Sequence, residues 1–260
     1  MHVHLGARRQ TPRAPLAAAA LSLALGGCAR HGPPGGGPTP GPPSGHDHRH
    51  SHGHAPTGGA DLRGPGHGHA MPHRFDDAAA WAARFDAPDR DSWQRPAEVL
   101  ATLGLQPGMV AADLGAGTGY FLPHLAAAVG TSGRVLALDV EPNLVAHMQA
   151  RAKAAGLGQV EARLIPFDDP GLAPASVDRI VTINTWHHIG GREAYAAKLK
   201  AALKPGGALV VVDYTLESED GPPKEHRLSP AQIIAELKAG GFDAAVVPEE
   251  LPRQLIIVAR

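Results

Sequence analysis

Short apolar runs alternate with helical segments after residue 108, and this alternation restricts the fold more than any other feature of the sequence. Five runs predict buried strands, at residues 109–114, 134–138, 160–165, 177–183 and 208–212. Helices are predicted between or after them, at residues 120–129, 142–155, 192–203 and 230–239. Repeated strand–helix units predict a mostly parallel sheet with helices on both faces.

Two last apolar runs, at 242–247 and 255–259, are joined by a connection too short for a crossover helix. They are therefore expected to pair antiparallel. The sequence predicts an α/β fold over residues 109–260: a Rossmann-like, seven-stranded, mostly parallel sheet with an antiparallel last strand. Short helices near 81–85 and 97–103 predict a helical cap over residues 75–108.

The charge balance and the cysteine count exclude several classes of protein. Lys and Arg number 24 against 25 Asp and Glu, so we expect no nucleic-acid partner. The single cysteine, Cys28, excludes a disulfide scaffold and a cysteine-based structural zinc site within one chain. No apolar run reaches the roughly 18–20 residues that span a bilayer.

Residues 1–28 have the features of an export signal. Arg8, Arg9 and Arg13 precede a short apolar run at 16–25, which ends in Leu25-Gly26-Gly27-Cys28. This ending resembles the lipobox of bacterial lipoproteins, in which the cysteine is acylated and anchors the protein to the membrane. The resemblance implies an exported, membrane-anchored protein on the periplasmic side, or a cytoplasmic one if the signal is not used. The alternative is an Ala/Leu-rich helix with a buried cysteine.

Residues 29–74 are rich in Gly, Pro and His and hold almost no large apolar side chains, which predicts a disordered tether. Neutral imidazole binds zinc, nickel and copper, and alternate spacing in a flexible chain lets several rings reach one ion. We therefore expect weak binding of zinc or nickel here; the alternative is a solvated linker. The candidate ligands are His46, His48, His50, His52, His54, His67 and His69, with His73 beyond them.

A glycine-rich segment, Asp113-Leu114-Gly115-Ala116-Gly117-Thr118-Gly119-Tyr120, stands between the first predicted strand and its helix. Glycines at such a turn allow positive φ and let a ligand approach the backbone. The G-x-G-x-x-G pattern of dinucleotide sites fails, because Tyr120 occupies the third glycine position. Asp139 ends the second predicted strand, where a carboxylate can accept both hydroxyls of a ribose.

In order and spacing, three segments resemble class I S-adenosylmethionine-dependent methyltransferases of the small bacterial type. They are Ala111 to Gly119, Ala137 to Pro142 (Ala-Leu-Asp-Val-Glu-Pro) and Leu203 to Gly207 (Leu-Lys-Pro-Gly-Gly). The resemblance covers the chain from about Trp93 to Arg260 and does not identify the methyl acceptor.

The resemblance implies roles for individual residues. The loop residues Gly115, Ala116, Gly117 and Gly119 would line the methionine part of S-adenosylmethionine, and Asp113 would order the loop and reach the amino group. Asp139 would bind the ribose, with Val140 or Glu141 beside the adenine. Asp168 or Asp169 would face the adenine amino group, and the choice between them stays open. Each aspartate has the alternative role of a helix cap or turn former.

Asn184-Thr185-Trp186-His187-His188 follows the fourth predicted strand, beside the expected point of methyl transfer. Asn184 is expected to contact the cofactor, although the Asn-Pro-Pro-Tyr motif of amino-group methyltransferases is absent. His187 and His188 are candidate catalytic bases, and the alternative is that one of them packs or caps the next helix. Trp93 either lies over the site or belongs to ordinary core.

Two functions therefore stand against each other. The first is a methyltransferase acting on a small-molecule or lipid-like acceptor. The second is a non-catalytic, membrane-tethered binding protein whose histidine-rich tail holds metal. The glycine loop and Asp139 favour the first, whereas the signal and the histidines favour the second.

Overall fold

The computed structural model describes residues 77–248 and 251–260, without the side chain of Ala79. The predicted signal peptide with Cys28, the tether and all its candidate metal ligands lie outside these residues. The helices are α1 (Ala78–Phe85), α2 (Arg90–Gln94), α3 (Pro96–Leu103), α4 (Leu122–Val129), α5 (Pro142–Ala154), α6 (Arg192–Ala202) and α7 (Pro230–Ala239). Single 3-10 turns are η1 (Trp186–His188) and η2 (Lys224–His226). Within the described ranges, no helix has the length and apolar content needed to cross a bilayer.

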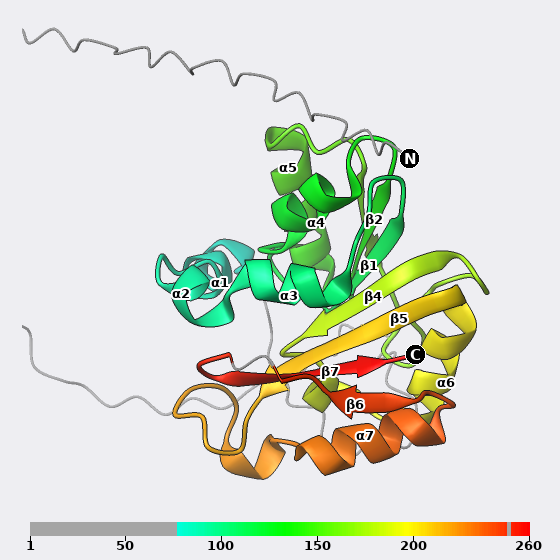
Figure 1. Ribbon diagram of the computed structural model, residues 1–260. Coiled ribbons are helices and arrows are strands. Elements are labelled where there is room, and N and C mark those ends of the chain that lie inside the picture. Colours follow the sequence, from blue (N-terminus) through cyan, green and yellow to red (C-terminus); the bar gives the residue numbers. More distant parts are fainter. Residues whose placement is uncertain (1–76, 249–250) are drawn as a thin grey trace, which may run out of the picture. The chain divides into compact units, whose positions relative to one another are not determined.

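Seven strands form one sheet in the order β3-β2-β1-β4-β5-β7-β6 (Figure 1). The strands are β1 (Val110–Leu114), β2 (Arg134–Asp139), β3 (Val160–Leu164), β4 (Val177–Ile183), β5 (Leu203–Tyr214), β6 (Ala244–Val246) and β7 (Gln254–Ala259). β3 to β5 pair in parallel across β2, β1 and β4, whereas β7 runs antiparallel to both β5 and β6. The predicted mostly parallel sheet with an antiparallel last strand is confirmed.

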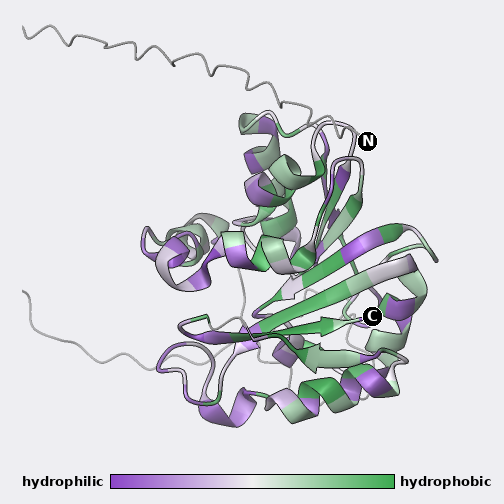
Figure 2. Cartoon of the chain, viewed as in Figure 1, coloured by the Kyte–Doolittle hydropathy of each residue, from purple (hydrophilic) through white to green (hydrophobic). Residues whose placement is uncertain are grey.

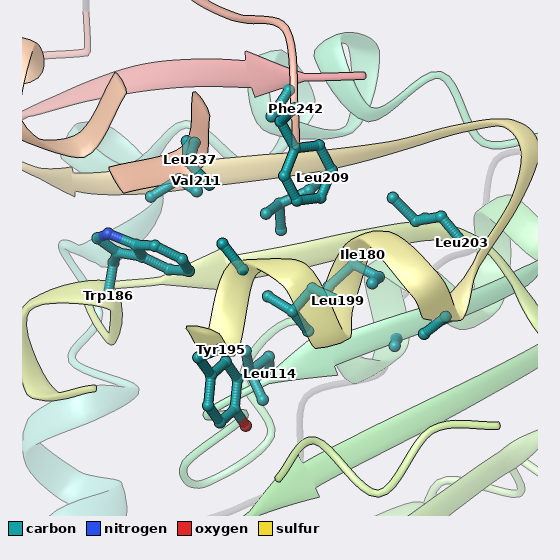
Figure 3. Packing of buried hydrophobic residues seen from close by; sticks show 14 of the residues in the cluster. Leu114, Ile180, Trp186, Tyr195, Leu199, Leu203, Leu209, Val211, Leu237 and Phe242 are labelled. Atoms are coloured by element: carbon teal, nitrogen blue, oxygen red, sulfur yellow. The ribbon is translucent and has the colours of Figure 1, made fainter. Parts of the chain in front are cut away.

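Each face of the sheet packs against its own set of helices. On one face, Val99, Leu122 and Met148 from α3, α4 and α5 pack against alternate residues of β1, β2 and β4. On the other face, residues of α6 and α7 cover the opposite side chains of the same sheet. Figure 3 shows Leu199 and Leu237 of these helices with Leu209 and Val211 of β5 in that cluster. Strands buried on both faces explain why their sequences are apolar almost throughout (Figure 2).

The start of β5 differs from the sequence-based prediction. The sequence predicts a helix up to residue 203 and a strand from residue 208, but β5 begins at Leu203, which pairs with Val177. Between Val177 and Arg179 the register then shifts, so that one residue of β4 opposes several of β5. Gly206 takes φ +76°, and a side chain at Gly207 would lie 2.8 Å from the carbonyl of Lys204. The glycines thus bend a strand that continues through them.

The sheet brings the carboxyl ends of β1, β2, β4 and β5 to one edge, and β7 begins at that same edge because it is antiparallel. Helices α1, α2 and α3 precede β1. The segment between α2 and α3 turns sharply at Arg95, a non-glycine residue with φ +46°. Ligands of open α/β sheets bind at the carboxyl ends of the strands, so this edge is where the predicted site residues are found below.

Candidate active site at the carboxyl edge of the sheet

The glycine loop that follows β1 has left-handed backbone at Gly115, Gly117 and Gly119, with φ of +72°, +59° and +81°. Two of these glycines are required by the protein's own packing. A Cβ atom on Gly115 would lie 2.3 Å from the side chain of Thr185, and one on Gly119 would lie 2.6 Å from Leu122. At Gly117 the nearest atom, on the Phe85 ring, would be 3.9 Å away. Gly117 is therefore the least crowded of the three glycines.

Asp139, at the tip of β2, turns toward this loop. Its Oδ2 accepts a hydrogen bond from the backbone N–H of Gly117 at 2.8 Å, and its Oδ1 accepts one from Glu141 N–H at 3.0 Å. The residue is only 6% exposed, and burial raises the pKa of its carboxyl while these backbone donors oppose the rise. Asp139 therefore lies between the loop and the β2–α5 turn, with Val140 and Glu141 directly after it.

Asp113, near the end of β1, is a second buried carboxylate at the same edge. It is 3% exposed and accepts no hydrogen bond from any described residue. Burial, assisted by the nearby Asp139 charge, raises its pKa to about 7, although the Arg90 guanidinium opposes the shift. A buried carboxylate without hydrogen bonds favours a cationic partner.

Helices α1 and α2 cover this loop through polar contacts. Asp86 accepts hydrogen bonds from Thr118 Oγ1 at 3.0 Å and from Arg151 of α5, which also donates to the carbonyl of Thr118. The guanidinium of Arg90 donates to the carbonyl of Phe85 at 2.6 Å and stacks over the ring of Tyr120, with 3.9 Å between the guanidinium carbon and the ring centroid. The helices before β1 are thus joined directly to the residues that follow the glycine loop.

A chain of buried amides continues from Arg90 to the end of β4. Arg90 Nη2 donates to Gln94 Oε1 at 3.2 Å, and Gln94 Nε2 donates to Gln254 Oε1 at 2.6 Å. Gln254, the first residue of β7, donates in turn to Asn184 Oδ1. Asn184 has φ +54°, and its side-chain nitrogen Nδ2 makes no hydrogen bond to the described residues. It remains available to a ligand.

His187 and Asp213 form a buried pair beside this chain. His187 Nδ1 lies 2.8 Å and 3.0 Å from the two carboxylate oxygens of Asp213, and the two side chains are 4% and 5% exposed. Asp213 ends the buried part of β5 and also accepts hydrogen bonds from the backbone of His187 and Tyr214. His188 is exposed, with its ring centroid 4.1 Å from that of His187. The two candidate bases therefore have very different surroundings.

Comparisons with known proteins agree with this geometry. Residues 111–207 match the methyltransferase-domain family. A solved S-adenosylmethionine-dependent methyltransferase from Aquifex aeolicus is 29% identical, with a TM-score of 0.66 over 70% of this chain and 97% of that one. Among curated relatives, a demethylmenaquinone methyltransferase from Bacillus cytotoxicus is 27% identical over 47% of this chain, and nocamycin O-methyltransferase from Saccharothrix syringae is 30% identical over 55%. The chain spans about half the length of these curated relatives, 51% and 48%.

Residues 111–207 thus match a methyltransferase domain, and the fold around them is similar to that of a solved S-adenosylmethionine-dependent methyltransferase. The residues at the carboxyl edge fit such a cofactor. The cofactor carries an ammonium and a sulfonium, and the methyltransferase domain offers the buried Asp113 carboxylate, which has no hydrogen-bond donor of its own among the described residues. Its ribose hydroxyls need acceptors, and Asp139 lies at the tip of the adjacent strand. Gly117, where an added Cβ atom would meet only the Phe85 ring at 3.9 Å, is the least crowded glycine of the loop.

The two aspartates that follow β3 have different hydrogen-bond partners in the methyltransferase domain. Asp169 accepts a hydrogen bond from Gly171 N–H at 2.8 Å and pairs with Lys198 at 3.3 Å, so its carboxylate is used within the loop. These partners lower the pKa of Asp169. Asp168 is exposed, and among the described residues only its backbone carbonyl accepts a hydrogen bond, from Lys198 at 2.6 Å. Of the two, only Asp168 has a carboxylate free for a ligand.

Four residues of the methyltransferase domain's polar core were not among the predicted site residues: Arg90, Gln94, Asp213 and Gln254. Their partners are distant in sequence, up to 160 positions between Gln94 and Gln254. Only Asp213 carried a visible signal, as an aspartate directly after a predicted strand. Trp93 is half-buried and stacks on Tyr214, with ring centroids 6.5 Å apart, so it is not ordinary core.

Proposed function

We propose that this protein transfers the methyl group of S-adenosylmethionine to a small-molecule or lipid-like acceptor. The observation that carries the proposal is the Asp139 carboxylate, hydrogen-bonded to Gly117 N–H at the least crowded glycine of the loop. The bound cofactor would supply an electrophilic methyl group on a sulfonium. The task left to the protein is to hold the acceptor in line with that methyl group and to remove a proton where the acceptor has one.

Individual residues of this chain have distinct parts in the proposal. Asp113 holds the cofactor's ammonium, and Asp139 accepts hydrogen bonds from its ribose with Val140 and Glu141 beside the adenine. Asp168, rather than Asp169, accepts from the adenine amino group, because Lys198 and Gly171 already engage Asp169. The side-chain N–H groups of Asn184 donate a hydrogen bond to the methionine part of the cofactor.

His187, rather than His188, is the base in this proposal. A base must keep one orientation while the acceptor binds, and Asp213 holds the His187 ring through Nδ1. His188 is exposed, whereas the His187 side chain is 4% exposed and held against Asp213.

Calorimetry with the full-length protein tests the proposal. We expect saturable binding of S-adenosylmethionine, weakened about 10- to 100-fold by Asp139→Asn, because the amide presents one hydrogen-bond acceptor where the carboxylate presents two. Asp243→Asn, an exposed aspartate before β6, is the matched control and should bind like the wild type. Asp168→Asn should weaken binding and Asp169→Asn should not. Absence of binding by the wild-type chain would reject the proposal in favour of a non-catalytic binding protein.

We also propose that the protein is exported and anchored to a membrane through an acylated Cys28, on the strength of the Leu-Gly-Gly-Cys sequence after the apolar run. Metabolic labelling with a radioactive fatty acid tests this. Label should enter the wild-type chain and not Cys28→Ser. Equal labelling of both chains, or none in either, would contradict anchoring.

A further inference from the structure

We propose that two copies of this chain associate through strand β3, whose free edges pair antiparallel about a twofold axis at Ala162. The proposal does not depend on the proposed function, because neither cofactor nor methyl acceptor takes part in the pairing. Three observations support it: the outward backbone groups of β3, the order of its charged residues, and the exposed apolar side chain at its end.

The two outer strands of the sheet, β3 and β6, differ in how much free edge they offer. β6 is three residues long, and Pro248 follows two positions after it, so it offers little backbone to another chain. β3 pairs with β2 in an unbroken register over all five of its residues, and it contains no proline or lysine. It packs mainly against β2 and α5. The edge of β3 therefore lacks the short length, the proline and the bulge that commonly protect a sheet edge.

The first observation is the direction of the backbone groups of β3. Its odd-numbered residues bond to β2, as the hydrogen bond from Val135 N–H to Gln159 C=O at 2.9 Å shows. In a parallel pair the residues between them turn their N–H and C=O groups the other way. Val160, Ala162 and Leu164 therefore present these groups at the outer edge of the sheet.

Few of these outward groups are used by the described residues. Val160 N–H donates to Leu157 C=O at 3.1 Å, and Ala162 C=O accepts from Gln149 Nε2 of α5 at 3.4 Å. The N–H groups of Ala162 and Leu164 have no acceptor within the described ranges. A second β3 centred on Ala162 supplies both acceptors, because Ala162 N–H then meets Ala162 C=O of the second copy and Leu164 N–H meets its Val160 C=O.

The second observation is that the charges of β3 are complementary to themselves in this register. Glu161 and Arg163 lie on one face of the strand, because the alternate residues Val160 and Ala162 face the cluster that α5 covers. Pairing centred on Ala162 places Glu161 of each copy opposite Arg163 of the other. These positions lie between the backbone hydrogen bonds, where opposed side chains are closest.

The contacts within one chain leave these groups able to pair across the axis. Glu161 accepts from Arg163 Nε at 2.5 Å and also pairs with Arg134 of β2. Both arginines, Arg163 first, lower the pKa of Glu161 to about 2, so it stays ionised near neutral pH. The terminal nitrogens of Arg163 have no acceptor in the described part of the chain. They are the groups that would meet Glu161 of the second copy.

The same charges disfavour the neighbouring registers. Pairing centred on Glu161 would place the two Glu161 side chains directly opposite each other, and pairing centred on Arg163 would do the same with the two arginines. Like charges directly opposite each other are destabilising. A shift by a single residue would exchange the two faces of the strand. The charges therefore favour one closed, twofold arrangement.

The third observation is the apolar side chain exposed at the end of β3. Val160 and Ala162 are partly buried against the cluster under α5, whereas Leu164 is 55% exposed. In the proposed register, Leu164 of each copy lies opposite Val160 of the other, so the pairing covers it. A five-residue edge buries less surface than a standard interface. We therefore expect a weak dimer, with a Kd of roughly 10–100 μM.

The first test is sedimentation velocity on the full-length protein over roughly 5 to 500 μM, with a reductant so that Cys28 cannot cross-link the copies. The wild-type chain should shift from monomer to dimer as its concentration rises. Glu161→Arg and Arg163→Glu should each weaken association at least 10-fold, because each places like charges opposite each other. Lys238→Glu, which reverses an exposed charge on α7, should associate like the wild type. A wild type that stays monomeric, or a dimer that neither reversal weakens, would overturn the proposal.

A mixture of the two reversal variants tests the register itself. In a heterodimer of Glu161→Arg with Arg163→Glu, both cross-strand positions again hold one arginine and one glutamate. The equimolar mixture should therefore associate within about threefold of the wild type, at total concentrations where each variant alone is monomeric. Thermal unfolding of each variant checks that it is folded. Folded variants that stay monomeric in the mixture would reject this register.

Amide hydrogen exchange of the wild type gives an answer that needs no variant. At the highest concentration the amides of Ala162 and Leu164 should exchange at least 10-fold more slowly than at the lowest, because they gain acceptors in the dimer. The amide of Val160 should change much less, since it already donates to Leu157. Unchanged exchange at Ala162 and Leu164 in a protein that dimerises would assign the interface to another surface and overturn the proposal.

Discussion

At the scale of single residues, two buried carboxylates dominate the candidate active site. Asp113 and Asp139 lie on adjacent strands of the sheet. Burial raises the pKa of both carboxyls, and the charge of Asp139 raises that of Asp113 further. Asp139 is compensated by backbone donors, whereas Asp113 has only the charge of Arg90 nearby. Asp113 therefore changes its ionisation near neutral pH.

The raised pKa of Asp113 gives a signed prediction for stability. Because its folded-state pKa, about 7, exceeds its ordinary value of 3.8, the cofactor-free fold binds the proton more tightly than the unfolded chain. Its contribution to stability is complete below about pH 4 and is lost as the pH rises through 7. Asp113→Asn should therefore raise Tm relative to the wild type by several degrees more at pH 8 than at pH 4, measured by thermal unfolding. An equal difference at both pH values would contradict this.

Cofactor binding should show the opposite sign, because a cationic ligand favours the ionised carboxylate. The affinity for S-adenosylmethionine should fall between pH 8 and pH 6, by up to tenfold per pH unit below 7. Calorimetry at three pH values measures the slope. Asp113→Asn, which does not titrate, should bind weakly and with a much smaller slope, and a wild-type slope retained in this variant would assign the effect to another group.

The glycines of the loop give a prediction in which two similar substitutions have different effects. Gly117→Ala adds a methyl group that would only touch the Phe85 ring, so it should cost about 1 kcal/mol for its left-handed backbone, but weaken cofactor binding at least 10-fold. Gly119→Ala adds a clash with Leu122 and Met148, so it should cost a further 1–3 kcal/mol or so. Thermal unfolding and calorimetry separate the two effects. Wild-type affinity in Gly117→Ala would show that the ligand does not approach there.

Many residues of the candidate site could be predicted from local sequence, whereas their long-range partners could not. The glycine loop, Asp139 and the segment after β4 are contiguous motifs at predicted strand ends, so they were found without a structure. Partners such as Gln254 for Gln94 depend on which strand begins beside which helix, and that follows only from the sheet order. The choice between Asp168 and Asp169 similarly required the position of Lys198 on α6.

At the scale of elements, the strands were predictable because burial on both faces leaves them apolar almost throughout. The first residues of helices and strands were less predictable. The first turn of α4 was expected at Tyr120, but the helix begins at Leu122, since Gly119 and Tyr120 still belong to the turn of the loop. The start of β5 at Leu203 was not predicted, because Pro205-Gly206-Gly207 on sequence alone indicates a turn. Helix α2 was missed because five residues carry no measurable periodicity.

Strand β4 contains one polar side chain that the sheet does not satisfy. Thr182 is fully buried between Leu114 and Val211 of the neighbouring strands, and its Oγ1 has no hydrogen-bond partner. Valine has nearly the same shape and removes the cost of burying that hydroxyl. Thr182→Val should therefore stabilise the fold by about 1 kcal/mol, or roughly 2–4 °C in Tm.

A second buried threonine serves as its control. Thr118 is 1% exposed, but its hydroxyl donates to Asp86 at 3.0 Å and joins the glycine loop to the segment after α1. Thr118→Val should thus lower Tm where Thr182→Val raises it. A lower Tm for Thr182→Val would mean that its hydroxyl has a partner in solution.

At the scale of the whole chain, two regions of contrasting composition are joined near residue 75. The residues from 77 onward build a complete seven-stranded sheet with both faces covered, and the candidate active site draws only on them. Among these described residues no group of three or more His, Cys, Asp or Glu side chains is arranged to hold a metal ion. We predict, from their sequence alone, that the histidines of residues 46–73 bind metal and that this binding is independent of the cofactor.

That independence is testable on the full-length protein. Zinc titration by calorimetry should show weak binding that is lost when His46, His48, His50, His52 and His54 are all replaced by Ala, because alternate imidazoles in a Pro/Gly-rich chain can converge on one ion. The affinity for S-adenosylmethionine should be the same in both chains, with and without zinc. A zinc-dependent change in cofactor affinity would require the two regions to be coupled, and absence of zinc binding by the wild-type chain would leave the histidines as a solvated linker.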